Sequence, residues 1–210
     1  MIIAIDGPAA AGKGTLSRKL ANHFDLALLD TGLIYRAVGM NLVRSGGDLN
    51  DAAAAVEAAQ NLKPENLNSK DLRADIAADA ASIISAVPEV RSSLIDFQRS
   101  FAANPPGGKC GAVLDGRDIG TVVCPKAEIK LFVTARPEIR AERRYLELRE
   151  RGLNVIYGPV LEDLKERDAR DSARIVSPLV PAIDAFLMDT SDLAVVEVFS
   201  KALEFINEKN

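Results

Sequence analysis

The sequence predicts an α/β protein in which a parallel five-stranded sheet is flanked by helices. Two observations support this prediction. Short apolar runs recur along the chain, and longer stretches with apolar residues at helical spacing separate them. Strands that alternate with helices form βαβ units, so the sheet is parallel and its ligand sites lie at the carboxyl ends of the strands. The expected strands are Ile2–Ile5, Ala27–Leu29, Ala112–Leu114, Ile129–Val133 and Phe186–Met188.

The expected helices fill the intervals between these strands. The helix that follows the strand Ala27–Leu29 runs through Ile34 and Leu42. It should end before Gly46 and Gly47, because glycine favours the end of a helix over its interior. Pro88 should interrupt the long helical stretch 72–101. The polar residues 61–69 break the helical pattern. The remaining helices are expected at Lys13–His23, Asp51–Gln60, Glu138–Arg151, Val160–Ala173 and Leu193–Asn207.

Length and composition indicate one globular domain with an insertion. The chain has 210 residues, of which 48% are hydrophobic and 27% charged. Its formal net charge of −4 excludes a globally basic nucleic-acid-binding protein. The two cysteines lack CxxC spacing, no basic-then-apolar leader opens the sequence, and no run approaches the roughly 18 apolar residues of a membrane span. We therefore expect a cytoplasmic monomer with no nucleic-acid or membrane partner.

A glycine-rich loop follows the first expected strand and precedes the first expected helix. Its glycines let successive backbone N–H groups point at phosphate oxygens, and the helix N-terminus adds partial positive charge. Lys13 is expected to be exposed at this loop and to reach the β and γ phosphates of a nucleoside triphosphate. The sequence therefore predicts a P-loop of the GxxxxGK type. Its residues are Gly7, Pro8, Ala9, Ala10, Ala11, Gly12, Lys13, Gly14 and Thr15.

The residue after the P-loop lysine indicates how a metal ion is held. Many P-loop proteins place a Mg²⁺-binding hydroxyl there, whereas this chain has Gly14 at that position and Thr15 one position later. We therefore expect Mg²⁺ to be held mainly by phosphates and water, with Thr15 as the candidate protein ligand. The GKGT form is typical of small-molecule kinases of the adenylate kinase type.

Charged residues near two further strand ends indicate a second, anionic ligand. The segment Asp30–Arg36 leads from a strand into a helix and places Arg36 about one turn in. The segment Asp115–Thr121 follows another strand, and two glycines flank Arg117 and Asp118 there. Such glycines indicate backbone crowded against a ligand, although a simple turn is the alternative interpretation.

Arginines are dense on two of the later expected helices. A solvated, salt-bridged face would explain them, but beside a P-loop they also suit the charge that spreads over the phosphoryl oxygens during transfer. The segment Gly152–Pro159 between the two helices is expected to be the hinge of a lid that closes over the triphosphate. The residues that share a helix face are Arg136, Arg140 and Arg144, then Arg167, Arg170, Asp171 and Arg174.

Taken together, these motifs resemble the bacterial cytidylate kinases over nearly the whole chain. The segment Ile5–Thr15 alone would not separate that family from other nucleoside monophosphate kinases, whereas Leu114–Val123 and Lys165–Arg174 do. The resemblance implies a P-loop kinase fold that transfers a phosphoryl group from ATP, with Mg²⁺, to CMP or dCMP. The matching motifs are IDGPAAAGKGT, LLDTGLIYR, LDGRDIGTVV, KERDARDSAR and SPLVPA.

The resemblance also implies roles for single residues. Arg36 and Arg117 would hold the acceptor phosphate, while Ser82, Arg91 and Asp118 would read cytosine, whose amino group suits a carboxylate. The residues expected to bind the acceptor are Thr31, Arg36, Ser82, Arg91, Arg117, Asp118, Arg167, Asp171 and Arg174. Those expected to act on the transferring phosphate or assist transfer are Lys13, Arg117, Arg143, Arg144 and Arg167.

The implied organisation is a single kinase domain over residues 1–210, with an acceptor-binding insertion at 35–105 and a lid at 140–175. The segment at about 61–70 is shorter and more polar than the β-rich insert of well-known members. It therefore leaves the preference between CMP and dCMP open. Two alternative functions also stay open. One is a kinase for UMP, AMP, GMP or another small acceptor, and the other is a P-loop module that holds nucleotide as a switch.

Overall fold

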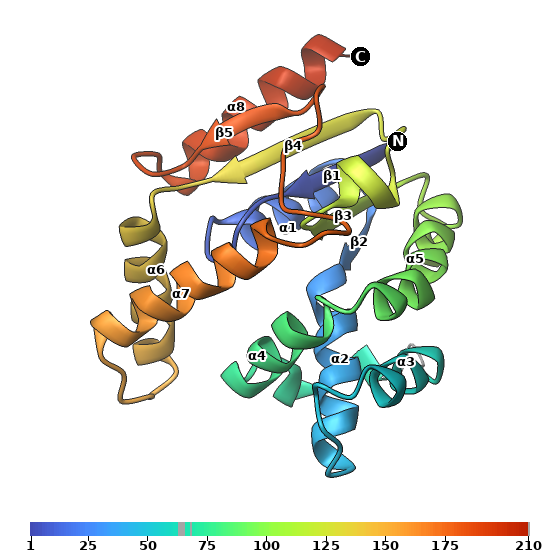
Figure 1. Cartoon of the computed structure of the whole chain (residues 1–210). Helices are drawn as coiled ribbons and strands as arrows, with labels where there is room; N and C mark the ends of the chain where they lie inside the picture. Colours follow the sequence, from blue (N-terminus) through green and yellow to red (C-terminus); the bar gives the residue numbers. More distant parts are fainter. Residues whose placement is uncertain (63–65, 68, 210) are drawn as a thin grey trace.

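A parallel sheet lies at the centre of the computed structural model, which describes residues 1–62, 66–67 and 69–209 (Figure 1). Its strand order is β2-β3-β1-β4-β5, and each neighbouring pair is parallel. The fold class and all five expected strands are confirmed, and each strand runs slightly past its expected carboxyl end. The strands are β1 (Ile2–Asp6), β2 (Ala27–Asp30), β3 (Ala112–Gly116), β4 (Ile129–Thr134) and β5 (Phe186–Asp189).

Apolar residues on opposite sides of the strands build two cores. Ile3 and Ile5 face one side, where they pack with apolar residues of α1 and α8, whereas Ala4 between them faces α2 and α5. The helices that flank the sheet are α1 (Lys13–His23), α2 (Thr31–Arg44), α5 (Pro88–Ala103) and α8 (Val195–Lys209). Because both faces are covered, the strands are almost continuously apolar.

The other helices form two groups that project from the sheet (Figure 1). One group follows α2 and consists of α3 (Ala52–Gln60), the 3₁₀ helix η2 (Lys70–Arg73) and α4 (Asp75–Ile84). The second group is the pair α6 (Pro137–Glu150) and α7 (Tyr157–Ser172), whose helices pack against each other. The first group lies within the expected insertion at 35–105, and the second covers most of the expected lid at 140–175, although α6 begins before it.

Local signals explain several helix ends. Asp51 begins α3 by accepting hydrogen bonds from the backbone N–H groups of Ala53 and Ala54. Pro88 is the first residue of α5, a position where its missing N–H has no helical partner. Two expectations need correction. Helix α7 begins at Tyr157, so the expected hinge segment is shorter, because Pro159 is tolerated in a first helical turn. A π-helix, η4 (Ile119–Val123), was not expected at all.

The segment at about 61–70 can be compared with the expectation only in part. Lys63, Pro64, Glu65 and Asn68 lie outside the described residues. The described residues between α2 and the short 3₁₀ helix η3 (Pro106–Gly108) form helices and turns, without a strand.

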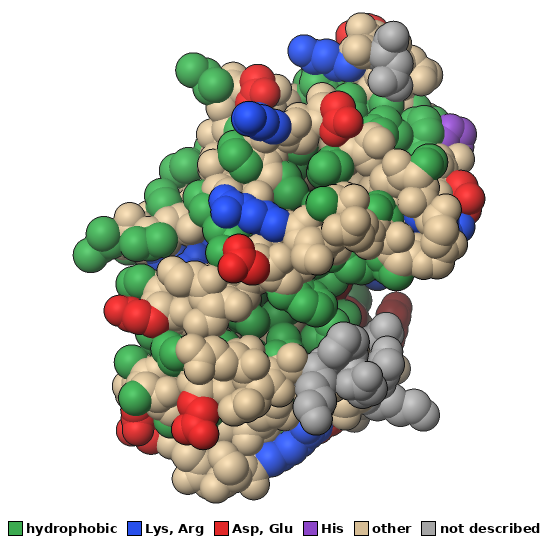
Figure 2. Space-filling view, turned by 90° about the vertical axis from the view of Figure 1, so that its right-hand side faces the viewer, with side chains coloured by type: hydrophobic (Ala, Val, Ile, Leu, Met, Phe, Trp, Pro, Cys, Tyr) green, Lys and Arg blue, Asp and Glu red, His purple; other side chains and the backbone are tan. Residues whose placement is uncertain are grey.

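Charge is mixed on the face that Figure 2 shows. Lysine and arginine side chains lie scattered among acidic, apolar and other residues, without gathering into a basic stripe on that face. Within the described part of the chain, none of the helices combines the length and apolar character needed to cross a membrane.

Candidate active site

The glycine-rich loop joins β1 to α1 at the carboxyl edge of the sheet. Gly7 has a φ of +145°, and a Cβ there would lie 1.9 Å from the carbonyl oxygen of Val133. No other residue fits so close to the neighbouring strand. Gly12, at φ +93°, is the N-cap of α1 and turns the chain into the helix. Backbone N–H groups at this helix start are available for an anion, as the motif predicted.

Lys13 is buried, and the expectation that it is exposed was wrong. Its side chain folds back over the loop, where Nζ donates to the carbonyl oxygen of Pro8 (2.9 Å) and lies 3.9 Å from Oδ1 of Asp115. Only 6% of the residue is exposed. Burial, and then the nearby Arg117, lowers the pKa of Lys13 to about 8, although Asp115 and Asp30 oppose this shift.

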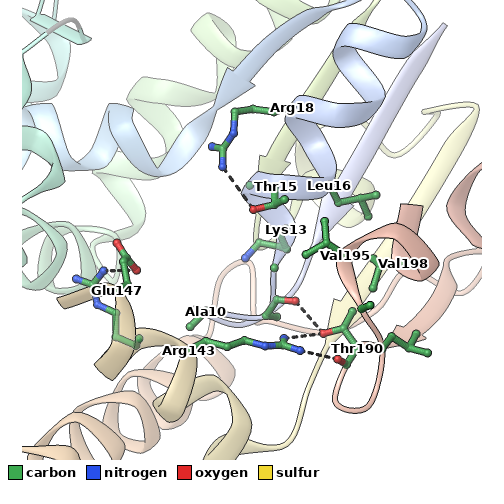
Figure 3. A pocket seen from close by; sticks show the side chains of 16 residues that line it. Ala10, Lys13, Thr15, Leu16, Arg18, Arg143, Glu147, Thr190, Val195 and Val198 are labelled. Carbon is green, nitrogen blue, oxygen red and sulfur yellow. Dashed lines mark hydrogen bonds and ion pairs between the residues drawn. The ribbon is translucent and has the colours of Figure 1, made fainter. Parts of the chain in front are cut away.

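A cavity of about 730 Å³ opens beside the P-loop (Figure 3). One side is formed by the loop and the first turn of α1, and the opposite side by α6 and the segment that leads from β5 into α8. Arg143 reaches across this space from α6 and donates to Oγ1 (2.9 Å) and O (2.6 Å) of Thr190. The hydroxyl of Thr190 in turn donates to the carbonyl of Ala11 (3.0 Å). Helix α6, the P-loop and the segment after β5 are thus tied together.

The three arginines expected to share one face of the helix that the structure shows as α6 make different contacts. Arg136 precedes α6 and pairs with Asp192 on the surface. Arg140 is buried, where it pairs with Asp168 of α7 and donates to the carbonyl of Ala9 in the P-loop (3.2 Å). Only Arg144 lines the cavity, together with Arg143. Four residues turn a helix through about 400°, so a row at this spacing drifts around the helix.

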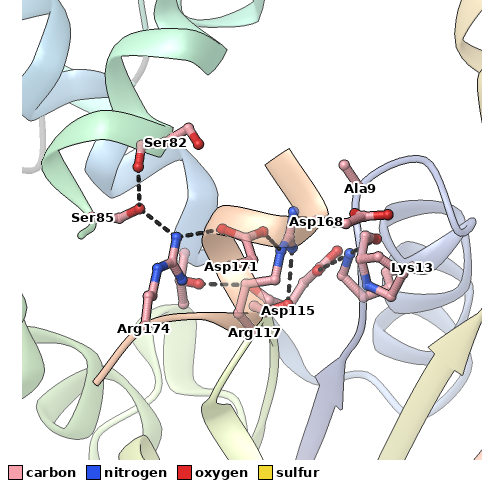
Figure 4. A network of polar contacts seen from close by, with 12 residues as sticks. Ala9, Lys13, Ser82, Ser85, Asp115, Arg117, Asp168, Asp171 and Arg174 are labelled. Atoms are coloured by element: carbon pink, nitrogen blue, oxygen red, sulfur yellow. Dashed lines mark hydrogen bonds and ion pairs between the residues drawn. The ribbon is translucent and has the colours of Figure 1, made fainter. Parts of the chain in front are cut away.

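A second group of charged side chains lies where β3 ends (Figure 4). Nε of Arg117 donates to Oδ2 of Asp171 (3.0 Å), and Arg174 pairs with the other oxygen of the same carboxylate. Arg91 pairs with Asp118, and both of these side chains are buried. Residues from α5, α7 and the β3 end therefore meet in one network. The spacing of the motifs in the sequence could not show this.

Two serines at the end of α4, Ser82 within the helix and Ser85 as its C-cap, border this network. Ser82 is 2% exposed, and its hydroxyl has no hydrogen-bond partner among the described residues. Ser85, one turn later, accepts from Nη2 of Arg174 (2.7 Å) through its hydroxyl and from Nη1 of Arg91 (3.3 Å) through its carbonyl. Tyr35 covers Arg91, whose guanidinium carbon lies 5.4 Å from the ring centroid.

The cavity inside this network measures only about 50 Å³. Pockets for drug-sized ligands span roughly 300–1,000 Å³, so a nucleotide base needs more room than this arrangement leaves. The charged side chains fill the space by pairing with one another. A ligand that entered would have to break these internal pairs and offer its own polar groups to the freed side chains.

Positive charge converges between the two cavities. Burial, and then Arg117, lowers the pKa of Arg167 to about 10, with Arg36 lowering it further. The pKa of Arg36 is likewise lowered, first by burial and then by Arg144 and Arg117. Cations that raise each other's energy in this way form a natural site for phosphate oxygens. Burial alone would raise the pKa of Asp171, but its arginine neighbours hold it below its usual range.

Comparison with known proteins decides the family. The family model for cytidylate kinase matches residues 3–208. A cytidylate kinase of Paramagnetospirillum magneticum is 62% identical over 208 residues, which cover 99% of this chain and 98% of that protein. A cytidylate kinase of Rhodospirillum rubrum is 54% identical over 210 residues, with 100% and 99% covered. The chain belongs to the cytidylate kinase family.

Membership of the cytidylate kinase family confirms the resemblance inferred from the motifs. The chain is a kinase, a transferase that uses ATP as phosphate donor and small nucleotides as substrates. A solved structure of an uncharacterized protein from Eubacterium ventriosum shares the fold, with a TM-score of 0.54 at 14% identity over 99% of this chain and 98% of that one.

The expected acceptor residues lie around the β3 end, but several contact protein rather than open space. Thr31 is buried, and its hydroxyl donates to the carbonyl of Asp115 (2.8 Å). Arg36 donates to the carbonyl of Leu72 (2.9 Å) in η2. Arg167 lines both the small cavity and a third cavity of about 590 Å³, which Arg144 also lines. Because Arg144 also lines the cavity beside the P-loop, these two arginines connect all three cavities.

Sequence reasoning missed five residues that shape the site. Asp6 is the last residue of β1 and Asp115 the second-last of β3, which was a readable signal, because strand ends were already expected to hold the ligands. Ser85 follows Ser82 by one helical turn and could have been found in the same way. Thr190 falls just after the last expected strand, at the edge where ligand sites were expected, but its contact with Arg143, 47 residues away, could not be read from the sequence. Asp168 carried no signal, because its partner Arg140 lies 28 residues away.

Proposed function

We propose that this chain transfers the γ-phosphoryl group of ATP to the phosphate of CMP or dCMP, giving ADP and CDP or dCDP. The convergence of Lys13, Arg36, Arg117 and Arg167 between the donor cavity and the buried network supports this proposal. If two phosphate-bearing ligands met there, their negative charge would be neutralised by cations from four different elements. Positioning and charge stabilisation account for most of phosphoryl-transfer catalysis, so no strong base is required.

The acceptor base would be read by the side chains that now pair with each other. Cytosine offers an amino donor to the carboxylate of Asp118, and acceptors to Arg91 and to the buried hydroxyl of Ser82. Arg174 would stay close to the base through Ser85. On binding, the Arg91–Asp118 pair would open toward the ligand, and hydrogen bonds to the base would replace those within the pair.

The rest of the acceptor would lie toward the converging cations. Arg36 and Arg117 would grip the monophosphate, because arginine forms paired hydrogen bonds with phosphate oxygens. Asp171 and Arg167 would meet the sugar, and Thr31 would line the same pocket. Arg143 and Arg144 would reach the transferring phosphate from α6 as the lid closes.

The donor would occupy the larger cavity, with its phosphates over Gly7–Thr15 and held by Lys13. The described residues contain no cluster of three or more His, Cys, Asp or Glu side chains suited to a metal. This fits a Mg²⁺ ion held mainly by phosphates and water, as small kinases use it. Asp115 is the carboxylate best placed beside Lys13, and Thr15 lines the same cavity. When bound, Mg²⁺ supplies charge neutralisation at the phosphates.

We further propose the organisation implied by the family. Residues 1–210 would form one kinase domain, 35–105 would bind the acceptor, and 140–175 would act as the lid. The protein would work as a monomer in the cytoplasm, where ATP and nucleoside monophosphates are available, and where its free thiols Cys110 and Cys124 would stay reduced. Size-exclusion chromatography with light scattering checks the oligomeric state.

A coupled assay of ADP release tests the proposed activity. The assay supplies Mg-ATP with each of CMP, dCMP, UMP, AMP and GMP. We expect turnover with CMP and dCMP and little with the purine nucleotides. Turnover with none would leave a nucleotide-binding P-loop and reject the acceptor assignment, and turnover centred on a purine would assign the pocket to another nucleoside monophosphate.

A further inference from the structure

Asp6 ends β1 and directly precedes the first glycine of the P-loop. Its side chain points away from that loop, toward the segment that follows β3. Oδ1 accepts a hydrogen bond from the backbone N–H of Ile119 (2.8 Å), and Oδ2 accepts one from Gly120 (2.7 Å). The residue is 4% exposed. One carboxylate thus grips two successive N–H groups of a chain segment 113 and 114 residues away.

These two N–H groups belong to the start of the π-helix η4, which Asp118 precedes as its N-cap. First-turn N–H groups have no partner within a helix, so an outside acceptor fixes the direction in which the helix begins. Asp118 itself offers no side-chain cap to this helix. Its carboxylate is directed to Arg91 instead, and Asp6 does the capping. Asp6 therefore orients the backbone on which Asp118 and Arg117 are mounted.

We propose that Asp6 is a positioning residue for the acceptor. Through its hydrogen bonds to the backbone of Ile119 and Gly120, it fixes the directions in which the side chains of Asp118 and Arg117 point. The inference rests on the proposed reaction with CMP. Because Asp6 also adjoins Gly7, it joins the start of the donor loop to the start of the base-reading segment. Burial raises the pKa of Asp6 to about 6 despite these hydrogen bonds, with Asp118 raising it further and Lys13 opposing. An apolar residue would be easier to bury at position 6 than the carboxylate that the chain has there.

Asp6→Asn tests the proposal with the smallest change of shape. The amide keeps one oxygen acceptor but presents an NH₂ donor to the second N–H group, which breaks the two-point grip. We expect KM for CMP to rise roughly tenfold, the cost of one charge-assisted hydrogen bond, while KM for ATP changes less than about threefold. We also expect the preference for CMP over UMP to fall, because the carboxylate of Asp118 is held less accurately toward the cytosine amino group.

Two further variants separate positioning from general stability. Ile206→Val removes a methylene from a fully buried side chain of α8, in the core on the opposite side of the sheet from Ile119, and should lower stability without changing the CMP:UMP ratio. Gly120→Ala keeps Asp6 but places a Cβ 3.4 Å from its Oδ2 and 3.3 Å from Cδ of Lys130. It should raise KM for CMP in the same direction as Asp6→Asn, and it keeps the test usable if Asp6→Asn does not fold.

The outcomes are distinguishable from failure of the proposed function. If the unmodified enzyme does not phosphorylate CMP, the proposed function fails, and this inference fails with it. If it does, and folded Asp6→Asn keeps both KM for CMP and the CMP:UMP ratio, Asp6 is only a structural cap and the proposal is overturned. An equal loss for ATP and CMP, or a shifted ratio in Ile206→Val, overturns it as well.

Discussion

Nζ of Lys13 lies 3.9 Å from Oδ1 of Asp115, and both side chains are buried. Lys13 belongs to the P-loop and Asp115 to the end of β3. A single ion pair therefore connects the P-loop to the segment that bears Arg117 and Asp118. The pair has consequences for both catalysis and folding.

Lys13→Met should reduce kcat by at least roughly a thousandfold, because it removes a charge that stabilises the transferring phosphoryl group. It should also lower the free energy of unfolding by up to roughly 3 kcal/mol, because Asp115 loses its nearest buried cation. Lys13→Met combined with Asp115→Asn should regain much of that stability and remain inactive. ADP release and urea unfolding measure the two effects. A single variant as stable as the parent would mean that Asp115 is neutral in the free enzyme.

The lowered pKa of Lys13, about 8 against an ordinary 10.5, predicts an alkaline effect on the free enzyme. Native Lys13 releases its proton earlier than unfolded Lys13, so its contribution to unfolding free energy rises between about pH 8 and 10.5. ATP binding should change in the opposite direction and weaken above pH 8, because the neutral amine no longer attracts phosphate. Calorimetric Kd values for ATP from pH 7 to 9.5 check this, with Lys13→Met expected to lack the dependence.

Asp118→Ala should reduce kcat/KM for CMP by about a hundredfold or more, while use of UMP changes little. The loss of CMP use follows from removing the acceptor for the cytosine amino group, whereas leaving Arg91 buried without its partner lowers the stability of the fold. Assays with both nucleotides measure it, and thermal unfolding should show a lower Tm. Arg91→Met in the Asp118→Ala background should restore part of the Tm but none of the discrimination. An equal loss for CMP and UMP would contradict base reading by Asp118.

The sequence predicted the sheet better than it predicted the site. Apolar runs such as Ile2–Ile5 specify buried strands locally, so the five strands needed no tertiary information. The burial of Lys13 did need it, because the side chain folds over Pro8 toward a residue 102 positions later. The mutual pairing of Arg117 with Asp171 was also hidden, since the motif showed two candidate ligand residues but not that each satisfies the other.

The π-helix η4 shows the same limit. Its five residues, Ile119–Val123, have no helical periodicity that a sequence pattern could detect. Its first two N–H groups donate to the carboxylate of Asp6, which the chain supplies from β1. The motif DGRDIGT was expected to hold backbone crowded against a ligand, and the close contact that the structure shows there is with the protein itself. A Cβ on Gly116 would lie 2.6 Å from Cδ1 of Ile119.

Asp171→Ala should impair recognition of the sugar and change the ratio of kcat/KM for CMP to that for dCMP. Both oxygens of this carboxylate are held by arginines, Arg117 and Arg174, so its loss also frees those side chains to move. We therefore expect a fall of roughly tenfold or more for both substrates in addition to the changed ratio. Asp171→Asn is the matched control, since it keeps an acceptor for one arginine. An unchanged ratio with lower rates would limit Asp171 to positioning its arginines.

Gly14→Ser should increase the apparent affinity for Mg²⁺. A Cβ at Gly14 would lie 3.5 Å from Nη1 of Arg18 and 3.6 Å from Oδ2 of Asp115, which are ordinary contacts, so the side chain fits without displacing its neighbours. The new hydroxyl would stand beside Asp115, at the position where many P-loop proteins hold Mg²⁺. Mg²⁺ titrations at fixed total ATP should give half-maximal activity at a severalfold lower free Mg²⁺ concentration. Gly14→Ala supplies the same Cβ without the hydroxyl and should match the parent, so an equal shift in both variants would rule out a metal contact.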